Sequence, residues 1–359
     1  MSTYPAEDRS PTVDVHAHIL LPALQQLVAE ADPDNFAAQQ ALEVRRNGPE
    51  SMAASGKMIK ERWPQLTDLD RRLADMDAQG VDVQLVSPSP SHFYYFAAGE
   101  LALQVAKAAN QAVRDFVDRA PDRLNGLGLV PLQHPSLMVE ALEHAVPGCG
   151  LLGVEIGSFA ATPDHPERGT VELSDPRLEP FWSRAEELGA LVFLHPFGCS
   201  LDERLDRFYL ANTVSQPAEN AVALSHLIFS GVLDRHPGLK VLAAHGGGYL
   251  PTTIGRSDHA WKVRPEARTC AAPPSSYLKK LYFDSLVHST AELRALVAAA
   301  GPEHVMLGSD YPFDMGADLP VDEVQAAGLP ADDEALVLGS NARTLGIIAA
   351  AALTARPNA

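Results

Sequence analysis

The sequence predicts an α/β protein: a single (β/α)8 barrel, TIM-like in architecture, with a long insertion after the first strand. Eight short, continuous apolar runs recur along the chain, as expected for parallel strands that are covered by helices outside and packed inside. Several of these runs end in proline or glycine, which stops strand pairing and begins a loop. The predicted strands span residues 13–18, 81–88, 124–131, 151–157, 190–196, 239–246, 281–288 and 305–312.

The stretches between these runs are amphipathic and predict the intervening helices, notably over residues 100–119, 136–146, 177–188 and 218–235. One connection is unusually long, because about fifty residues separate the first strand from the helix that begins near Thr67. We expect this insertion, residues 19–66, to form a lid or a wall of the substrate pocket. The barrel would cover residues 13–350 as one domain, with tails at 1–12 and 351–359.

Composition and charge exclude several classes of partner. The chain has 359 residues, of which 46% are hydrophobic, so it can bury a large core. A formal net charge of -18 argues against nucleic acid and anionic membranes, although a few clustered arginines would still allow an acidic substrate. Neither a signal peptide nor a membrane span is evident. Three cysteines without paired spacing fit a reducing compartment, so we expect a soluble cytoplasmic protein.

Four side chains of metal-binding type lie at the ends of predicted strands that are far apart in the sequence. His16 and His18 stand in Val-Asp-Val-His-Ala-His, His195 in Leu-Val-Phe-Leu-His-Pro, and Asp310 in Leu-Gly-Ser-Asp-Tyr-Pro. In a parallel barrel these ends converge on one mouth, where catalytic residues gather. A His-x-His match alone is weak, because about half a match is expected by chance among 13 histidines in 359 residues. On a strand, however, residues i and i+2 point to the same side, so both imidazoles can bind one ion.

His195 and Asp310 differ in how strongly each one indicates a metal site. His195 taken alone would more often be a hydrogen-bonded core histidine. Asp310 is a stronger signal, because a carboxylate in an apolar context is costly to bury unless it is paired or bound to a metal. Together, three imidazoles and one carboxylate make a plausible ligand set for Zn²⁺, with Mn²⁺ and Co²⁺ as alternatives.

His245 ends another predicted strand, in Val-Leu-Ala-Ala-His-Gly-Gly-Gly, where the glycines let backbone and ligand approach closely. A neutral imidazole beside a metal-bound water can act as a general base, and its protonated form as a general acid. We therefore expect His245 to be the catalytic acid/base. The alternatives are that His245 is a further metal ligand, or that it contacts a metal ligand and holds that ligand in position.

These motifs resemble those of the amidohydrolase superfamily (amidohydrolase-2), and within it the aminocarboxymuconate-semialdehyde decarboxylase group. The matching segments are Val-Asp-Val-His-Ala-His, Phe-Leu-His-Pro-Phe, Ala-His-Gly-Gly-Gly, Ile-Gly-Arg-Ser-Asp-His and Leu-Gly-Ser-Asp-Tyr-Pro-Phe. Residues 78–88 and the segment Phe-Asp-Ser-Leu-Val-His are similar too. The resemblance runs from about residue 13 to residue 345, and the motifs follow the family's order.

The resemblance implies one Zn²⁺ held by the set His16, His18, His195 and Asp310, with His245 as the acid/base. It further implies that Arg256 binds a substrate carboxylate from a neighbouring subunit, in a homodimer or a higher homo-oligomer. Without that role, Arg256 is an ordinary surface arginine.

The resemblance also points to residues that would contact the substrate. Phe313 and Phe197 match positions that wall the substrate, although packing alone would explain either, and Phe197 stands where tryptophan is expected. The family's other substrate arginine lies in the insertion, where three arginines compete for the place: Arg45, Arg46 and Arg62. Among them we take Arg62 and Arg46 as substrate-binding candidates.

Glu155 is a further departure from the family pattern, because a neutral amide is expected at its position on the fourth strand. Amidohydrolases with two metal ions often carry a bridging lysine or acid on that strand. One metal ion is favoured here, because no lysine is available there and Glu155 need not face inward.

The sequence therefore predicts a metal-dependent, non-oxidative decarboxylase of a small unsaturated or aromatic carboxylic acid, of the aminocarboxymuconate-semialdehyde or hydroxybenzoate type. Such a carbon–carbon lyase would need no organic cofactor. The alternative is a hydrolase or hydratase that uses the same metal site on a small carboxylated substrate. A third possibility, a non-catalytic binding barrel, predicts that no metal is bound.

Overall fold

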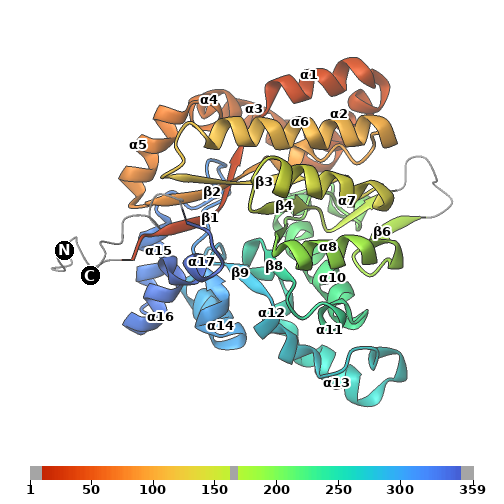
Figure 1. Ribbon diagram of the computed structural model, residues 1–359, viewed down its shortest axis with the longest axis vertical. Coiled ribbons are helices and arrows are strands. Elements are labelled where there is room, and N and C mark those ends of the chain that lie inside the picture. The colour runs from red at the N-terminus through yellow and green to blue at the C-terminus, as the bar shows by residue number, and fades with distance from the viewer. Residues whose placement is uncertain (1–9, 162–168, 349–359) are drawn as a thin grey trace.

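A parallel barrel forms the centre of the computed structural model, which describes residues 10–161 and 169–348 (Figure 1). Its strands are hydrogen-bonded in the order β1-β2-β3-β4-β7-β8-β9-β10. The ring closes between its ends, because Val15 N donates to Leu307 O (2.8 Å) and His18 N donates to Tyr311 O (2.7 Å). The predicted (β/α)8 fold is thereby confirmed. The barrel strands are β1 (Val13–Ile19), β2 (Val83–Pro88), β3 (Leu124–Leu129), β4 (Gly153–Ile156), β7 (Leu191–Leu194), β8 (Lys240–Ala243), β9 (Tyr282–Asp284) and β10 (Val305–Met306).

Most strands end earlier than the apolar runs predict. The run 281–288 yields only β9, and the run 305–312 yields only β10. Near these ends the backbone enters the left-handed region at His245, His288 and Asp310, with φ of 54°, 55° and 56°. A strand cannot continue through such a conformation, which non-glycine residues rarely adopt outside functional sites. His245 and Asp310 at the barrel mouth therefore project from irregular backbone.

Helices follow the strands and cover the barrel. The longer covering helices are α5 (Leu69–Gln79), α6 (Gly99–Val117), α7 (Pro135–Glu143), α8 (Glu179–Leu188), α10 (Ser215–Phe229) and α14 (Thr290–Ala300). The remaining helices are α9 (Leu210–Thr213), α11 (Val232–Arg235), α12 (Leu250–Thr253), α13 (Gly255–Val263), α15 (Pro320–Ala326), α16 (Ala331–Ala335) and α17 (Asn341–Thr344). Local signals set their ends. At α5, the Asp68 side chain accepts from the first amides, and Gly80 (φ 72°) ends the helix.

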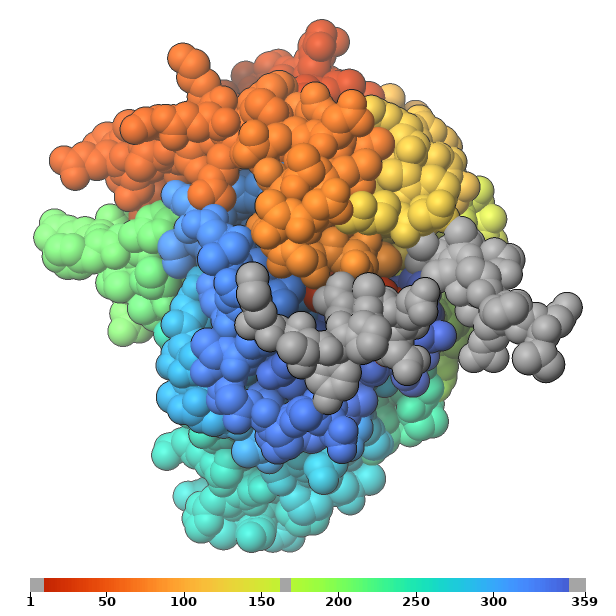
Figure 2. Space-filling model, turned by 90° about the vertical axis from the view of Figure 1, so that its left-hand side faces the viewer, coloured from red at the N-terminus to blue at the C-terminus, as the bar shows by residue number. Residues whose placement is uncertain are grey.

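The insertion after β1 is helical. It consists of α1 (Pro22–Ala31), α2 (Pro33–Asn47), α3 (Pro49–Glu61) and α4 (Trp63–Thr67). Each of the four begins with proline at its first or second position, where the missing N–H is not needed. No residue of α2 or α3 is buried. In Figure 2 the orange surface of this part of the chain meets the blue surface of the C-terminal part.

One element was not predicted from the sequence. β5 (Phe159–Ala161) and β6 (Thr170–Glu172) form a separate antiparallel pair after β4. The predicted tails, 1–12 and 351–359, lie outside the described residues except for 10–12. Within the ranges that the structure describes, no helix is long and apolar enough to cross a membrane.

The apolar core has two layers. A larger layer lies between the strands and the covering helices. A smaller one fills the barrel, and it includes Val15, Leu85, Leu127, Phe193 and Met306. The Phe193 ring lies 5.0 Å from the ring of His16, centroid to centroid. The apolar filling of the barrel therefore reaches up to the polar residues at the mouth.

Candidate metal centre and active site

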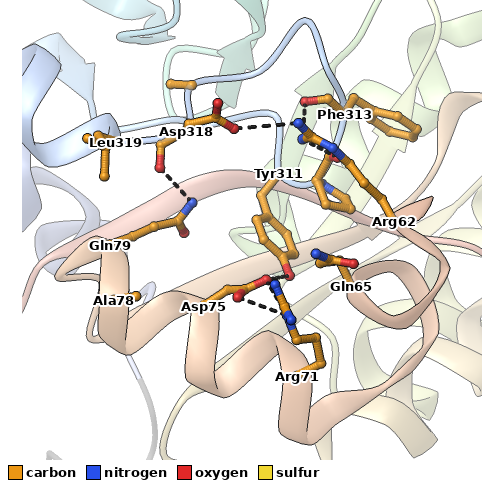
Figure 3. A pocket seen from close by; sticks show the side chains of 12 residues that line it. Arg62, Gln65, Arg71, Asp75, Ala78, Gln79, Tyr311, Phe313, Asp318 and Leu319 are labelled. Atoms are coloured by element: carbon orange, nitrogen blue, oxygen red, sulfur yellow. Dashed lines mark hydrogen bonds and ion pairs between the residues drawn. The ribbon is translucent and has the colours of Figure 1, made fainter. Parts of the chain in front are cut away.

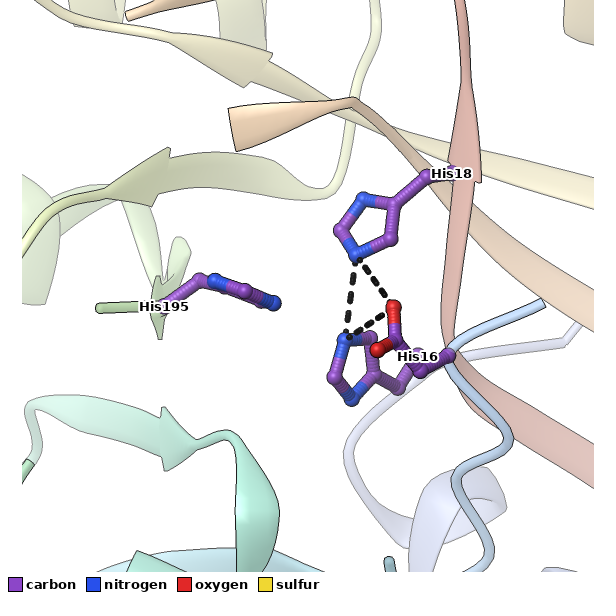
Figure 4. A group of neighbouring side chains, drawn as sticks. His16, His18 and His195 are labelled. Atoms are coloured by element: carbon purple, nitrogen blue, oxygen red, sulfur yellow. Dashed lines mark hydrogen bonds and ion pairs between the residues drawn. The ribbon is translucent and has the colours of Figure 1, made fainter. Parts of the chain in front are cut away.

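The four residues predicted as metal ligands come together at the carboxyl ends of the strands. His16 and His18 lie on β1, His195 follows β7, and Asp310 follows β10 (Figure 4). All four are buried, and their ligand atoms lie within 4.8 Å of one another. His16 Nε2 is 3.1 Å from His18 Nε2, and Asp310 Oδ1 lies 3.4 Å and 3.2 Å from these two nitrogens. Three segments distant in sequence thus form one metal-binding site.

This geometry fits a divalent ion. Ligand atoms about 2.0–2.1 Å from one ion at tetrahedral or octahedral angles are roughly 2.8–3.4 Å apart. The distances among His16, His18 and Asp310 fall within this range. Two of the inward atoms, His195 Nε2 and Asp310 Oδ1, are buried without a hydrogen-bond partner in the described part of the chain. Buried polar atoms of this kind are costly unless an ion satisfies them.

The protonation states also suit metal binding. Burial works to raise the pKa of Asp310, but the nearby histidines outweigh burial and hold that pKa well below its usual range. Burial, reinforced by the charges of neighbouring histidines, holds the pKa of His195 well below its usual range. The carboxylate is therefore ionised and the imidazole carries a free lone pair, as metal ligands must.

The outer nitrogen of each histidine ligand is held in place. His16 Nδ1 lies 2.6 Å from Asp284 Oδ2, His18 Nδ1 lies 3.1 Å from Ser87 Oγ, and His195 Nδ1 lies 3.0 Å from Pro196 O. Such partners orient a ligating imidazole and leave the inward Nε2 for the ion. Burial works to lower the pKa of His16, but the charges of Asp310 and Asp284 reverse the shift and raise it.

Asp284, at the end of β9, is a site residue that the sequence reasoning missed. Its carboxylate is fully buried and accepts hydrogen bonds from His245 N (2.9 Å) and Gly246 N (2.8 Å) besides contacting His16. Burial works to raise the pKa of Asp284, but His16 outweighs it and the pKa is lowered. A signal was present, because Asp284 ends an apolar run just as Asp310 does.

His245 lies at the edge of the same cluster. Its Nε2 is 3.9 Å from Asp310 Oδ2, and its ring centroid lies 4.9 Å from that of His195. The turn around it requires glycine, because a Cβ on Gly248 (φ +63°) would lie 2.1 Å from Pro217 O. The side chain keeps 19% exposure, so it can meet a ligand at the mouth. Its role as acid/base stays a prediction.

The aromatic candidates lie on the loops that carry the ligands. The Phe313 ring is 5.6 Å from the His18 ring, and the Phe197 ring is 6.3 Å from that of Phe93. Phe313 thus lies next to a metal ligand, whereas the ring of Phe197 packs against the ring of Phe93. Whether either contacts substrate stays a prediction.

The candidate arginines of the insertion have different surroundings. Arg62 donates to Pro312 O (2.8 Å) and Phe313 O (3.1 Å), beside a cavity of about 290 Å³ that lies between α5 and the β10 loop (Figure 3). Arg45 is ion-paired with three carboxylates of the segment 202–206.

Arg46 is the most enclosed of the three, with 13% side-chain exposure. It donates to Cys199 O (3.3 Å) on the β7 loop, and its Nε is buried without a partner among the residues described. Arg256 behaves differently, because it is exposed on α13 and forms no hydrogen bond or ion pair within the described ranges.

Glu155 faces the barrel interior. Its register partner on β7 is Phe193, whose side chain belongs to the inner apolar layer. The carboxyl is fully buried, and it does not belong to the group whose ligand atoms lie within 4.8 Å. Glu155 therefore does face inward, which the sequence left open. It is not a fifth metal ligand in this arrangement.

A parallel barrel with three imidazoles and one carboxylate at its mouth defines a metal-dependent barrel enzyme. The chain belongs to the amidohydrolase family, because the model of that family matches residues 13–345. The resemblance inferred from the motifs is confirmed.

Two relatives that the chain resembles in sequence are decarboxylases. The chain is 34% identical over 314 residues to the 2-amino-3-carboxymuconate-6-semialdehyde decarboxylase of Dictyostelium discoideum, covering 87% of this chain and 84% of that protein. It is 28% identical over 300 residues to the gamma-resorcylate decarboxylase of Rhodococcus jostii, covering 81% and 91%.

A solved structure shares the fold. The 5-carboxyvanillate decarboxylase of Novosphingobium aromaticivorans, complexed with manganese and 4-hydroxy-3-methoxy-5-nitrobenzoic acid, superposes with a TM-score of 0.80 at 20% identity. The match covers 95% of this chain and 97% of that one.

Proposed function

We propose that the protein is a metal-dependent, non-oxidative decarboxylase of a small unsaturated or aromatic carboxylic acid. One observation carries the proposal: the converging ligand set with His245 beside it, in an amidohydrolase chain whose named relatives release carbon dioxide from such acids. Both relatives are matched over more than four fifths of their length, so the comparison concerns whole enzymes.

The resident ion is proposed to be Zn²⁺, because three imidazole nitrogens and one carboxylate oxygen suit it. Mn²⁺ and Co²⁺ accept the same donors, and the structural neighbour with manganese makes Mn²⁺ the first alternative to test. When bound, the ion would stabilise negative charge on a substrate oxygen next to the scissile bond.

His245 is proposed to deliver the proton. As the bond between the substrate carbon and its carboxylate breaks, the electron pair stays on that carbon, and carbon dioxide leaves. A proton from the His245 ring then forms the new C–H bond, so atoms and charge balance. The position of His245, 3.9 Å from Asp310 and partly exposed at the mouth, supports this role.

Arg46 is the proposed carboxylate-binding arginine of the insertion. An arginine fork suits a carboxylate, and only Arg46 of the three candidates combines burial, proximity to the β7 loop and a free buried Nε in the described structure. Arg62 already donates hydrogen bonds to two backbone carbonyls. Its predicted substrate contact would require those bonds to open.

A homodimer or larger homo-oligomer is proposed to complete the site through Arg256. This arginine stands on α13, which contains no buried residue and projects from the barrel in Figure 1. A guanidinium exposed in one chain is free to reach the mouth of another. We also propose the reducing cytoplasm as location, because all three cysteines are unpaired.

The test is carbon dioxide release from a panel of carboxyl-labelled acids: 2-amino-3-carboxymuconate-6-semialdehyde, 2,6-dihydroxybenzoate and 5-carboxyvanillate. We expect labelled carbon dioxide and product in equal amounts from at least one of them, and no release by His245→Asn. Asparagine tolerates the left-handed backbone at this position, so the variant should fold. Turnover without carbon dioxide would contradict the proposal in favour of hydrolysis or hydration.

A further inference from the structure

Glu155 is the buried acid for which the proposed mechanism has no use. It is 0% exposed, and both of its carboxyl oxygens lack a hydrogen-bond partner within residues 10–161 and 169–348. An unsatisfied buried polar group lowers stability by about 1–3 kcal/mol, and more if it is charged. A leucine of similar volume would fit the surrounding apolar layer better. The presence of an acid here therefore calls for a reason other than folding.

The neighbours of Glu155 point to the metal centre. Ser87 is 1% exposed and lies on β2, which contacts the strand of Glu155. The Ser87 hydroxyl lowers the pKa of Glu155, against the larger rise that burial causes, although no hydrogen bond of ordinary geometry joins the two side chains in the described residues. The same hydroxyl lies 3.1 Å from His18 Nδ1. Ser87 is also the register partner of His18 across the β1–β2 pair. One hydroxyl thus stands between a buried acid and a metal ligand.

The direction of these contacts follows from the role of His18. Its Nε2 faces the other ligand atoms, so Nδ1 carries the hydrogen when Nε2 binds an ion. Nδ1–H then donates to Ser87 Oγ, or to Pro88 O at 3.3 Å. In the first arrangement the Ser87 O–H is left free to donate to the Glu155 carboxyl. The hydroxyl becomes a better acceptor when its own hydrogen is donated.

We propose that Glu155 is a positioning residue of the metal centre, which acts on His18 through the hydroxyl of Ser87. His16 would then be supported directly by Asp284 and His18 indirectly by Glu155, while His195 relies on a backbone carbonyl alone. Such outer partners fix the ring orientation and raise the basicity of a metal ligand. The inference rests on the metal binding that the proposed function requires.

The first experiment measures Zn²⁺ affinity of metal-free protein by competition with a chromogenic chelator. Glu155→Leu, which removes the acceptor, should bind Zn²⁺ about tenfold more weakly, the lower end of the range for outer partners of metal ligands. Glu155→Gln keeps an acceptor and should retain most of the affinity. Ser158→Ala is the matched control, because Ser158 follows the same strand and its buried hydroxyl also lacks a partner in the part of the chain described.

A double-mutant cycle tests the path through Ser87. Ser87→Ala should weaken binding as much as Glu155→Leu, and the double variant should lose no more than either, because both break one connection. Losses that multiply in the double variant would overturn the path. The inference also fails if Glu155→Leu binds within about twofold of the wild type, or if Ser158→Ala loses as much. A wild-type protein that binds no metal would instead contradict the proposed function.

Thermal unfolding of the metal-free proteins separates positioning from a structural role. Glu155→Leu should melt at a higher temperature than the wild type, because an unsatisfied buried acid has been removed. A lower melting temperature, together with unchanged metal affinity, would show that Glu155 serves folding. If Glu155→Leu does not fold, Ser87→Ala carries the affinity test by itself.

Discussion

Replacing Asp284 by asparagine should weaken metal binding without breaking the barrel. Asp284 Oδ2 lies 2.6 Å from His16 Nδ1, and both side chains are 0% exposed. Hydrogen bonds to charged groups contribute about 1.5–3 kcal/mol, and about 1.4 kcal/mol corresponds to a tenfold change in an equilibrium constant. The affinity for Zn²⁺ should therefore fall by roughly 10- to 150-fold.

The variant should also slow turnover at saturating metal. Asp284 accepts hydrogen bonds from His245 N and Gly246 N, whereas the amide of asparagine keeps only one oxygen and places its NH₂ group against the other donor. The backbone that carries His245 would shift, and kcat should decrease even after metal is restored.

The assay is chelator competition on metal-free protein, followed by turnover at saturating metal. Asp234→Asn is the control, because Asp234 accepts from the Tyr277 hydroxyl (2.7 Å) and from Ala271 N (2.9 Å), contacts unrelated to the metal ligands. That variant should lose stability but keep its metal affinity. The reasoning is refuted if Asp284→Asn is folded and binds Zn²⁺ within about twofold of the wild type.

Three further predictions concern stability and substrate binding. Burial lowers the pKa of His92 from 6.5 to about 4; between these values only the unfolded chain binds the proton, so the free energy of unfolding should fall by about 3 kcal/mol from pH 7 to pH 4. His92→Gln should lack this part of the fall, as urea unfolding of the wild type and the variant at each pH would show. Gly248→Ala should destabilise more than Gly328→Ala, since both have φ near +63° but only Gly248 has an atom within 4 Å of the added Cβ; equal midpoints in thermal unfolding would contradict this. Arg46→Lys should raise KM by about tenfold or more, while Arg45→Lys, on an exposed arginine, should change it little, as steady-state kinetics would show.

Much of the fold could be predicted because barrel strands have a local signature. The strand Val83–Pro88 is buried along its whole length and ends in proline, and most of its residues are apolar, as expected for a strand covered on both faces. The β5–β6 pair could not be found in this way. Its strands have only three residues each, which is too short for a recognisable strand pattern in the sequence.

The metal ligands were predictable for a related reason. Asp310 stands out against the apolar residues before it, and the barrel topology then places it beside His16. Asp284 carries a similar signal, but its role depends on β9 lying where a carboxylate can reach both His16 and the His245 backbone. The surroundings of Arg46 are likewise non-local, since its partner Cys199 is 153 residues away.

The helices inserted after β1 can change in sequence with little consequence for the barrel. Since α2 and α3 bury no residue, most substitutions there should leave the free energy of unfolding almost unchanged. The same helices bring Arg46 to the mouth, where it meets the β7 loop. A segment that tolerates substitution and also carries the proposed carboxylate-binding arginine is where we expect new substrate preferences to arise first, while the metal centre stays intact.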